Sequence, residues 1–191
     1  MGVRALQSSS SEAGSTAATE VRPDLVALAL AGAASGIAAA VMLTHFGLGA
    51  RGLIEAFAAV VLVVLAAIDV QTRLLPNRIV LPAAAVVLAA QLVFFPSHAP
   101  TVIGAAIGTA LFFFIPTLIS ARAVGMGDVK LGLLIGAALG KHVPEALLLA
   151  SLAMFPVALA LLVRHGREAR GTAIPFGPFL AGGSILALLL T

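Results

Sequence analysis

Asp69 and Asp128 are the two residues whose type and position best suit catalysis. Asp69 stands at the end of one long apolar run, and Asp128 stands at the start of another. An ionisable side chain beside the hydrocarbon of a bilayer is costly to desolvate, so it usually has a partner or a function. The other acids lie in the N-terminal tail, in or beside loops, or near a helix start, where the helix dipole favours an anion. Asp69 and Asp128 are therefore interpreted as a functional pair.

Each aspartate also has a structural interpretation when it is considered alone. Asp128 could cap the helix that it opens and pair with Lys130, and Asp69 could pair with Arg73 one helical turn later. Lys130 fits either a residue that tunes the carboxylates or a side chain that reaches from an interface to water. The shared depth of the two acids, beside a glycine-flanked turn, favours the functional interpretation.

Two carboxylates that share a site suit the chemistry of aspartic proteolysis. They cannot both ionise easily, so one holds a proton that the other lacks. The ionised carboxylate takes a proton from a water molecule while the protonated one polarises the scissile carbonyl, and the pair titrates as a unit. Gly125 and Gly127 suit such a site, because residues without Cβ let an extended substrate approach closely.

Composition places these residues in a membrane protein. Of the 191 residues, 61% are hydrophobic and only 10% are charged, whereas soluble domains carry roughly 25% charged residues. The net charge is +3 and the basic residues stand in short gaps between apolar runs, so a lipid bilayer is the expected partner and nucleic acid is not. The sequence has no Cys and no clustered His, so neither a metal nor another cofactor is expected.

The apolar runs predict an all-α polytopic bundle of about seven spans, six long and one short. Residues 1–23 are rich in Ser, Ala, Thr and Gly and lack an apolar core, which predicts a disordered tail, and residues 24–191 are expected to form one transmembrane domain. At 17–25 residues per helix, roughly, the long spans are predicted near 24–46, 52–70, 79–96, 101–121, 143–163 and 173–190. The short segment 128–140 is either a span or a re-entrant element.

The distribution of basic residues favours the seven-span model. Lys and Arg accumulate on the cytoplasmic side of a membrane protein. With seven spans and a cytoplasmic N-terminus, Arg51 and Lys141 lie outside, and the other basic residues share the cytoplasmic side: Arg4, Arg22, Arg73, Arg78, Arg122, Lys130, Arg164, Arg167 and Arg170. Both aspartates then lie at the cytoplasmic boundary of the membrane.

Around the aspartates the sequence resembles the type IV prepilin leader peptidase family, a group of intramembrane aspartic peptidases with a Gly-x-Gly-Asp motif. Gly125 to Leu131 matches the family's second aspartate motif, which includes Lys130. Asp69, followed by Pro76-Asn77 before the next span, matches the first. A third similarity, Pro175-Phe176-Gly177-Pro178, precedes the last span.

The resemblance implies a function and a set of site residues. Asp69 and Asp128 would be catalytic, with Gly125, Gly127, Lys130, Pro76 and Asn77 as supporting residues and Pro175 to Pro178 on the substrate side. The expected activity is cleavage of the leader from a type IV pilin or pseudopilin precursor, at the cytoplasmic face of a prokaryotic plasma membrane. This places the chain in pilus assembly or protein secretion, with another membrane protein as substrate.

Two departures from the family pattern refine this expectation. Classical members carry a Cys-rich cytoplasmic loop that is associated with N-methylation, and this chain has no Cys, so it resembles the compact, peptidase-only members. Gln71 stands where many members have a second acid, which leaves Asp69 as the candidate at that site.

Two other functions compete with the peptidase. A small proton-coupled transporter could use the aspartates as a relay, although no ionisable residue near mid-membrane continues the path. A non-catalytic membrane assembly scaffold would need neither aspartate.

Overall fold

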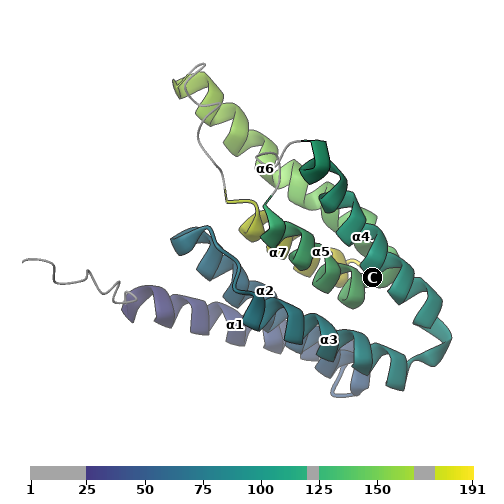
Figure 1. The fold of residues 1–191 in the computed structure, drawn as a ribbon. Helices are drawn as coiled ribbons and strands as arrows, with labels where there is room; N and C mark the ends of the chain where they lie inside the picture. The colour runs from purple at the N-terminus through teal and green to yellow at the C-terminus, as the bar shows by residue number, and fades with distance from the viewer. Residues whose placement is uncertain (1–24, 120–124, 166–174) are drawn as a thin grey trace, which may run out of the picture.

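The computed structural model describes residues 25–119, 125–165 and 175–191, and these residues form helices with no strand among them. The α-helices of the described ranges are α1 (Leu25–Phe46), α2 (Ala50–Thr72), α3 (Asn77–Phe94), α4 (Ala99–Ile119), α5 (Met126–Leu139), α6 (Val143–His165) and α7 (Gly177–Leu189), arranged as in Figure 1. Two 3-10 turns, η1 (Pro96–His98) and η2 (Gly140–His142), join α3 to α4 and α5 to α6. The predicted all-α bundle is confirmed, and the predicted tail 1–23 lies outside the described residues.

Within the described ranges, five helical stretches are long and apolar enough to cross a membrane. They are α1 from Val26, α2, α3, the stretch Pro96–Leu118 and the continuous stretch Met126–Arg164. With 14 and 13 residues, α5 and α7 are each about 20 Å long, against about 30 Å of hydrocarbon. The chain is thus a multi-pass membrane helix bundle in which two helices are short.

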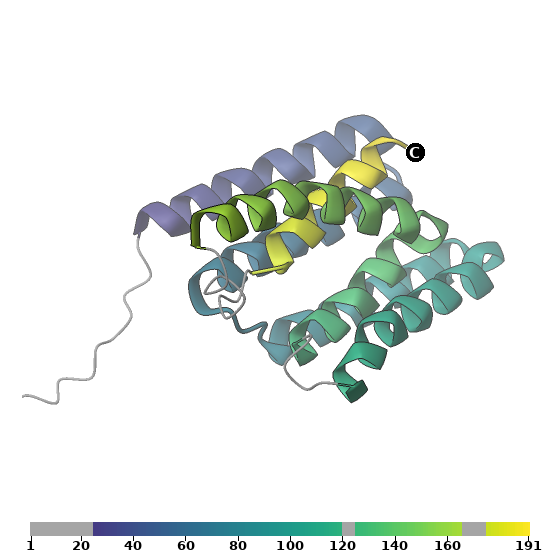
Figure 2. The same ribbon diagram turned by 90° about the horizontal axis from the view of Figure 1, so that it is seen from above.

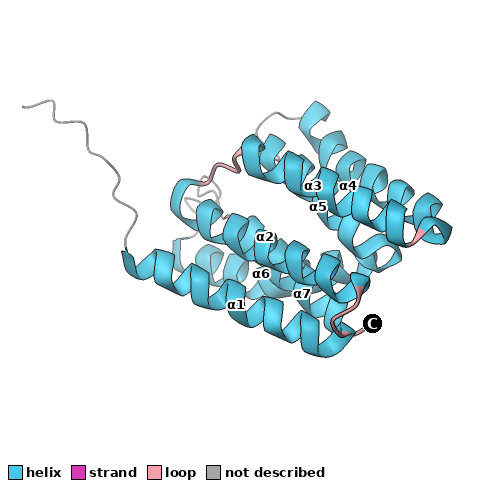
Figure 3. Cartoon of the chain, turned by 90° about the horizontal axis from the view of Figure 1, so that it is seen from below, coloured by secondary structure: helices cyan, strands magenta, loops and turns pink. Residues whose placement is uncertain are grey.

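The helices divide into two groups around α2. Figures 2 and 3 show α1, α2, α6 and α7 together on one side and α3, α4 and α5 on the other. The groups meet chiefly where α2 packs on α3, and where α5 packs on α7 and α2. Fully buried leucines from three helices fill this junction: Leu62, Leu65, Leu131, Leu134 and Leu180. The last turn of α2 and the first turns of α5 and α7 extend from this core.

Close packing between α4 and α5 fixes the position of α5. A Cβ added at Gly136 would lie 2.5 Å from the Ala105 carbonyl oxygen and 2.5 Å from the Ala106 Cα. One turn earlier, a Cβ at Gly132 would lie 2.8 Å from the Phe113 ring. The backbones can therefore approach this closely only because both positions are glycine.

The sidedness of the bundle stays a prediction, since residues 120–124 and 166–174, with several of the basic residues, lie outside the described ranges. We expect the α1–α2 loop to face outward and the α2–α3 loop to face the cytoplasm. Leu48 lies in the first of these loops and Leu74 in the second, and their side chains are 82% and 74% exposed, so a Cys at either position would be accessible to a label. Because the sequence has no Cys, a labelling reagent would give no background signal.

A membrane-impermeant maleimide should label Leu48→Cys in intact spheroplasts and Leu74→Cys only after permeabilisation. Labelling in the reverse order would overturn the seven-span topology.

Candidate active site

Asp69 lies in the last turn of α2, and its side chain is buried, with 6% exposed. Helix α2 ends at Arg73, which adopts a left-handed conformation (φ 53°) and donates its N–H to the Asp69 carbonyl at 2.9 Å. The carboxylate points away from this turn: its Oδ2 accepts a hydrogen bond from the Gly177 N–H at 3.0 Å. Among the described residues, the Asp69 side chain thus accepts a hydrogen bond from the backbone of α7. It does not form the ion pair with Arg73 that the sequence spacing allows.

Gly177 can make this contact because it has no side chain. A Cβ at this position would lie 2.6 Å from Asp69 Oδ2 and 3.0 Å from Asp69 Cγ, well inside van der Waals contact. Gly177 is the first residue of α7, so its N–H is one of the helix N-terminal donors that favour a negative partner. The predicted site segment Pro175 to Pro178 therefore reaches the aspartate through the Gly177 backbone.

The neighbours of Gly177 hold this segment in place. Phe176 is half-buried, and its ring meets the Phe113 ring of α4 edge to face at 6.1 Å. Pro178 occupies the first turn of α7, where its fixed φ and missing N–H suit a helix start. A substrate-side role for these residues stays a prediction.

Asp128 lies in the first turn of α5, and its side chain is half-buried. The helix is opened by Gly125, which has no side chain with which to cap it, and the Asp128 N–H donates to the Gly125 carbonyl at 3.0 Å. The Asp128 carboxyl lies close enough to Asp69 for their negative charges to repel each other. The structure therefore brings the two aspartates of distant sequence motifs into one electrostatically coupled site.

Lys130 and Asn77 join the two aspartate motifs directly. The Lys130 Nζ donates a hydrogen bond to the Asn77 Oδ1 at 2.6 Å, which links α5 to the first residue of α3. The extended backbone of Pro76 (φ −71°, ψ 120°) precedes this residue and opens α3. A Cβ at Gly127 would lie 3.0 Å from Leu75 Cβ, so the α2–α3 turn packs closely against the start of α5.

Both motif segments lie within one family match. The family model described as "Type IV leader peptidase family" matches residues 56–159, from the early part of α2 to α6, which is more than half of the chain and contains both aspartates. This chain belongs to the type IV leader peptidase family.

Individual relatives agree with this membership. Three proteins, each named "Prepilin leader peptidase/N-methyltransferase", come from Bacillus subtilis, Burkholderia pseudomallei and Xanthomonas campestris. They are 36%, 35% and 31% identical over 71%, 81% and 72% of this chain, which correspond to 56%, 52% and 50% of their own lengths. The chain thus spans about half the length of these relatives. No solved structure shows a significant match.

Sequence reasoning missed one contact within the site of this family member. The motif around Gly177 was assigned to the substrate side, whereas the structure shows that its N–H binds Asp69. Glu55 was also interpreted only as an acid near a helix start, and the structure places it 3% exposed in a cavity at the other end of α2. The motif Pro175-Phe176-Gly177-Pro178 marked the segment that contacts Asp69. No sequence pattern pointed to the burial of Glu55.

Proposed function

We propose that the chain is an aspartic endopeptidase whose catalytic residues are Asp69 and Asp128. The observation that carries the proposal is the convergence of the last turn of α2 with the first turns of α5 and α7, which couples the two carboxyls in a chain of this family. The buried aspartate has its orientation set by the Gly177 N–H, and the half-buried one is open to a substrate or a water molecule.

Peptide hydrolysis at this site needs one proton shared by the dyad. The ionised carboxylate removes a proton from water as the water oxygen attacks the scissile carbonyl carbon, and the protonated carboxyl donates a hydrogen bond to the carbonyl oxygen. Collapse of the tetrahedral intermediate breaks the C–N bond, and the proton taken from water passes to the leaving amine. The dyad returns to its starting state without any other reactant.

The substrate that we propose is the precursor of a type IV pilin or pseudopilin. Relatives that match most of this chain are named as prepilin leader peptidases and N-methyltransferases. A site at one end of a helix bundle suits a bond that lies just outside a substrate's own membrane helix. We propose cleavage at the cytoplasmic face of the plasma membrane, and we do not extend the proposal to methyl transfer.

Co-expression with a prepilin, in a host that lacks prepilin peptidases, tests this function. The wild-type chain should convert the precursor to a mature form whose new N-terminus, read by mass spectrometry, directly precedes the hydrophobic helix. Complete retention of the precursor, with each of several type IV prepilins and with the peptidase present in the membrane fraction, would contradict the proposal.

The contact between Lys130 and Asn77 should affect the rate of cleavage without being essential. Lys130→Ala and Asn77→Ala each remove one hydrogen bond to a charged group, worth about tenfold in rate if the bond aligns the two motifs. Because both changes remove the same contact, the double variant should be no slower than either single one. Arg164→Ala, at an exposed position near the end of α6, is the control.

The rate of precursor conversion in isolated membranes measures this effect. If the fold reductions in rate of the two single variants multiply in the double variant, the two residues act separately.

A further inference from the structure

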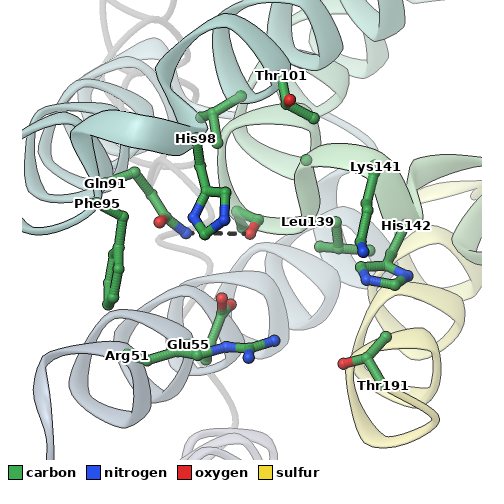
Figure 4. Close-up of a pocket in the computed structure, with 13 residues that line it drawn as sticks. Arg51, Glu55, Gln91, Phe95, His98, Thr101, Leu139, Lys141, His142 and Thr191 are labelled. Atoms are coloured by element: carbon green, nitrogen blue, oxygen red, sulfur yellow. Dashed lines mark hydrogen bonds between the residues drawn. The ribbon is translucent and has the colours of Figure 1, made fainter.

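A cavity of about 380 Å³ lies at the end of the bundle opposite the aspartates. It is lined by the first two turns of α2, the first turn of α4, the ends of α3 and α5, the turns η1 and η2, and Thr191 (Figure 4). Glu55 and Asp69 both belong to α2 and are about 21 Å apart along its axis. The cavity is therefore separate from the proposed catalytic site and belongs to the other membrane interface.

Glu55 is the feature of this cavity that calls for a ligand. Its side chain is 3% exposed, and its Oε2 is buried without a hydrogen-bond partner among the residues that the structure describes. Figure 4 shows the carboxyl group pointing away from α2 toward His98 and Gln91, into the space between the helices. A buried polar group without a partner costs free energy, so a group that donates hydrogen bonds to Glu55 would be bound favourably.

Basic side chains stand around the same cavity. Arg51 belongs to the first turn of α2, with its guanidinium carbon 4.5 Å from the centre of the Phe46 ring. Lys141 and His142 follow Gly140, whose φ of +53° turns the chain between α5 and α6 and presents both side chains at the cavity (Figure 4). The cavity thus combines one buried acid with two permanent positive charges.

This combination discriminates between classes of ligand. A simple anion would satisfy Arg51 and Lys141 and leave Glu55 unpartnered, whereas a simple amine would do the reverse. A metal ion is disfavoured, because no group of three His, Cys, Asp or Glu among the described residues is arranged to hold one. A zwitterion with an ammonium group and a phosphate group satisfies both sets of side chains.

We propose that this cavity binds a phosphoethanolamine group, with its ammonium on Glu55 and its phosphate on Arg51 and Lys141. The volume is within the range of small-molecule sites, roughly 300–1,000 Å³. The lining residues come from helix ends, which lie at the level of the lipid headgroups in a membrane-spanning bundle. The group can come from a phospholipid headgroup or from a soluble phosphoethanolamine compound.

Binding to the full-length protein in detergent tests the proposal by native mass spectrometry. The probes are dioleoyl phosphatidylethanolamine, phosphatidylcholine and phosphatidylglycerol, with water-soluble glycerophosphoethanolamine as a competitor. Wild type should bind phosphatidylethanolamine at least about tenfold more tightly than phosphatidylcholine, whose quaternary ammonium has no N–H to donate to Glu55. Displacement by the soluble competitor would identify the headgroup alone as sufficient, and its failure would identify the lipid as the source.

Glu55→Gln should abolish the preference for phosphatidylethanolamine over phosphatidylcholine and leave phosphatidylglycerol binding intact. Lys141→Ala, at an exposed position, should weaken phosphatidylethanolamine and phosphatidylglycerol alike by about tenfold, and it remains a test if Glu55→Gln does not insert. Glu145→Gln is the matched control, since Glu145 is exposed at the start of α6 and outside the cavity lining.

Equal binding of the two zwitterionic lipids by wild type, or wild-type affinity in both cavity variants, would overturn the proposal. Because the readout is binding and not cleavage, the result is independent of the proposed peptidase activity.

Discussion

Asp69→Asn and Asp128→Asn should each reduce leader cleavage by about 10²–10⁴-fold, the contribution expected of a general acid or base. Asn retains the size of Asp and an oxygen that can still accept the Gly177 N–H, so the α2–α7 contact survives in Asp69→Asn. What it loses is the ability to exchange a proton. The expected loss therefore separates a chemical role of the carboxyl from a structural one.

The double variant should be scarcely slower than either single variant, because the members of a dyad act as one unit. The measurement is the ratio of precursor to mature pilin on co-expression, normalised to the peptidase in the membrane fraction. Glu145→Gln, the same kind of change at an exposed position, should leave this ratio unchanged. Substantial processing by either Asn variant would show that the aspartate pair is structural and supplies no proton transfer to cleavage.

Gly177→Ala should reduce cleavage by about 10²-fold or more, because the new methyl group cannot fit. Its Cβ would lie 2.6 Å from Asp69 Oδ2 and 3.1 Å from Asp69 Cβ, so either the carboxylate or the start of α7 must move. Movement breaks the 3.0 Å hydrogen bond and leaves a buried carboxylate without that donor. Displacement of a catalytic group by about 1 Å can cost roughly this much in rate.

Gly182→Ala provides the control within the same helix. A Cβ at Gly182 meets nothing within 4 Å in the described structure, and Ala has the higher helix propensity. Cleavage by Gly182→Ala should therefore match that of wild type. Equal activity of Gly177→Ala and Gly182→Ala would show that the close approach of α7 to Asp69 has no part in catalysis.

Hydropathy predicted the helices of this bundle well, because the hydrocarbon layer imposes an apolar run on each of them. The span predicted near 52–70 is the helix Ala50–Thr72, and the short segment predicted near 128–140 is the helix Met126–Leu139. That short helix leads from the aspartate end of the bundle to the cavity end, and its crossing of the bilayer stays a prediction. The prediction of a single short helix missed α7, whose regular part also has only 13 residues.

The candidate site was only partly predictable. Asp69 and Asp128 are rare residue types at the ends of apolar runs, so the sequence alone could nominate them. The donor to Asp69 is a backbone N–H from a residue 108 positions away, so the motif around Gly177 could mark the segment but not its contact with Asp69. The burial of Glu55 could not be predicted either, because it depends on where the ends of α3 and α5 pack against α2.

The short helices α5 and α7 have a consequence for the lipid around the site. Both begin beside the aspartates, and both are about a third shorter than the hydrocarbon layer is thick. Such hydrophobic mismatch is relieved by a local thinning of the bilayer, at a cost that rises with the thickness of the surrounding membrane. We therefore expect the headgroup region and its water to lie closer to Asp69 and Asp128 than to the ends of the longer helices. In the proposed peptidase, this would bring a bond that otherwise lies within acyl chains within reach of the water that hydrolysis consumes.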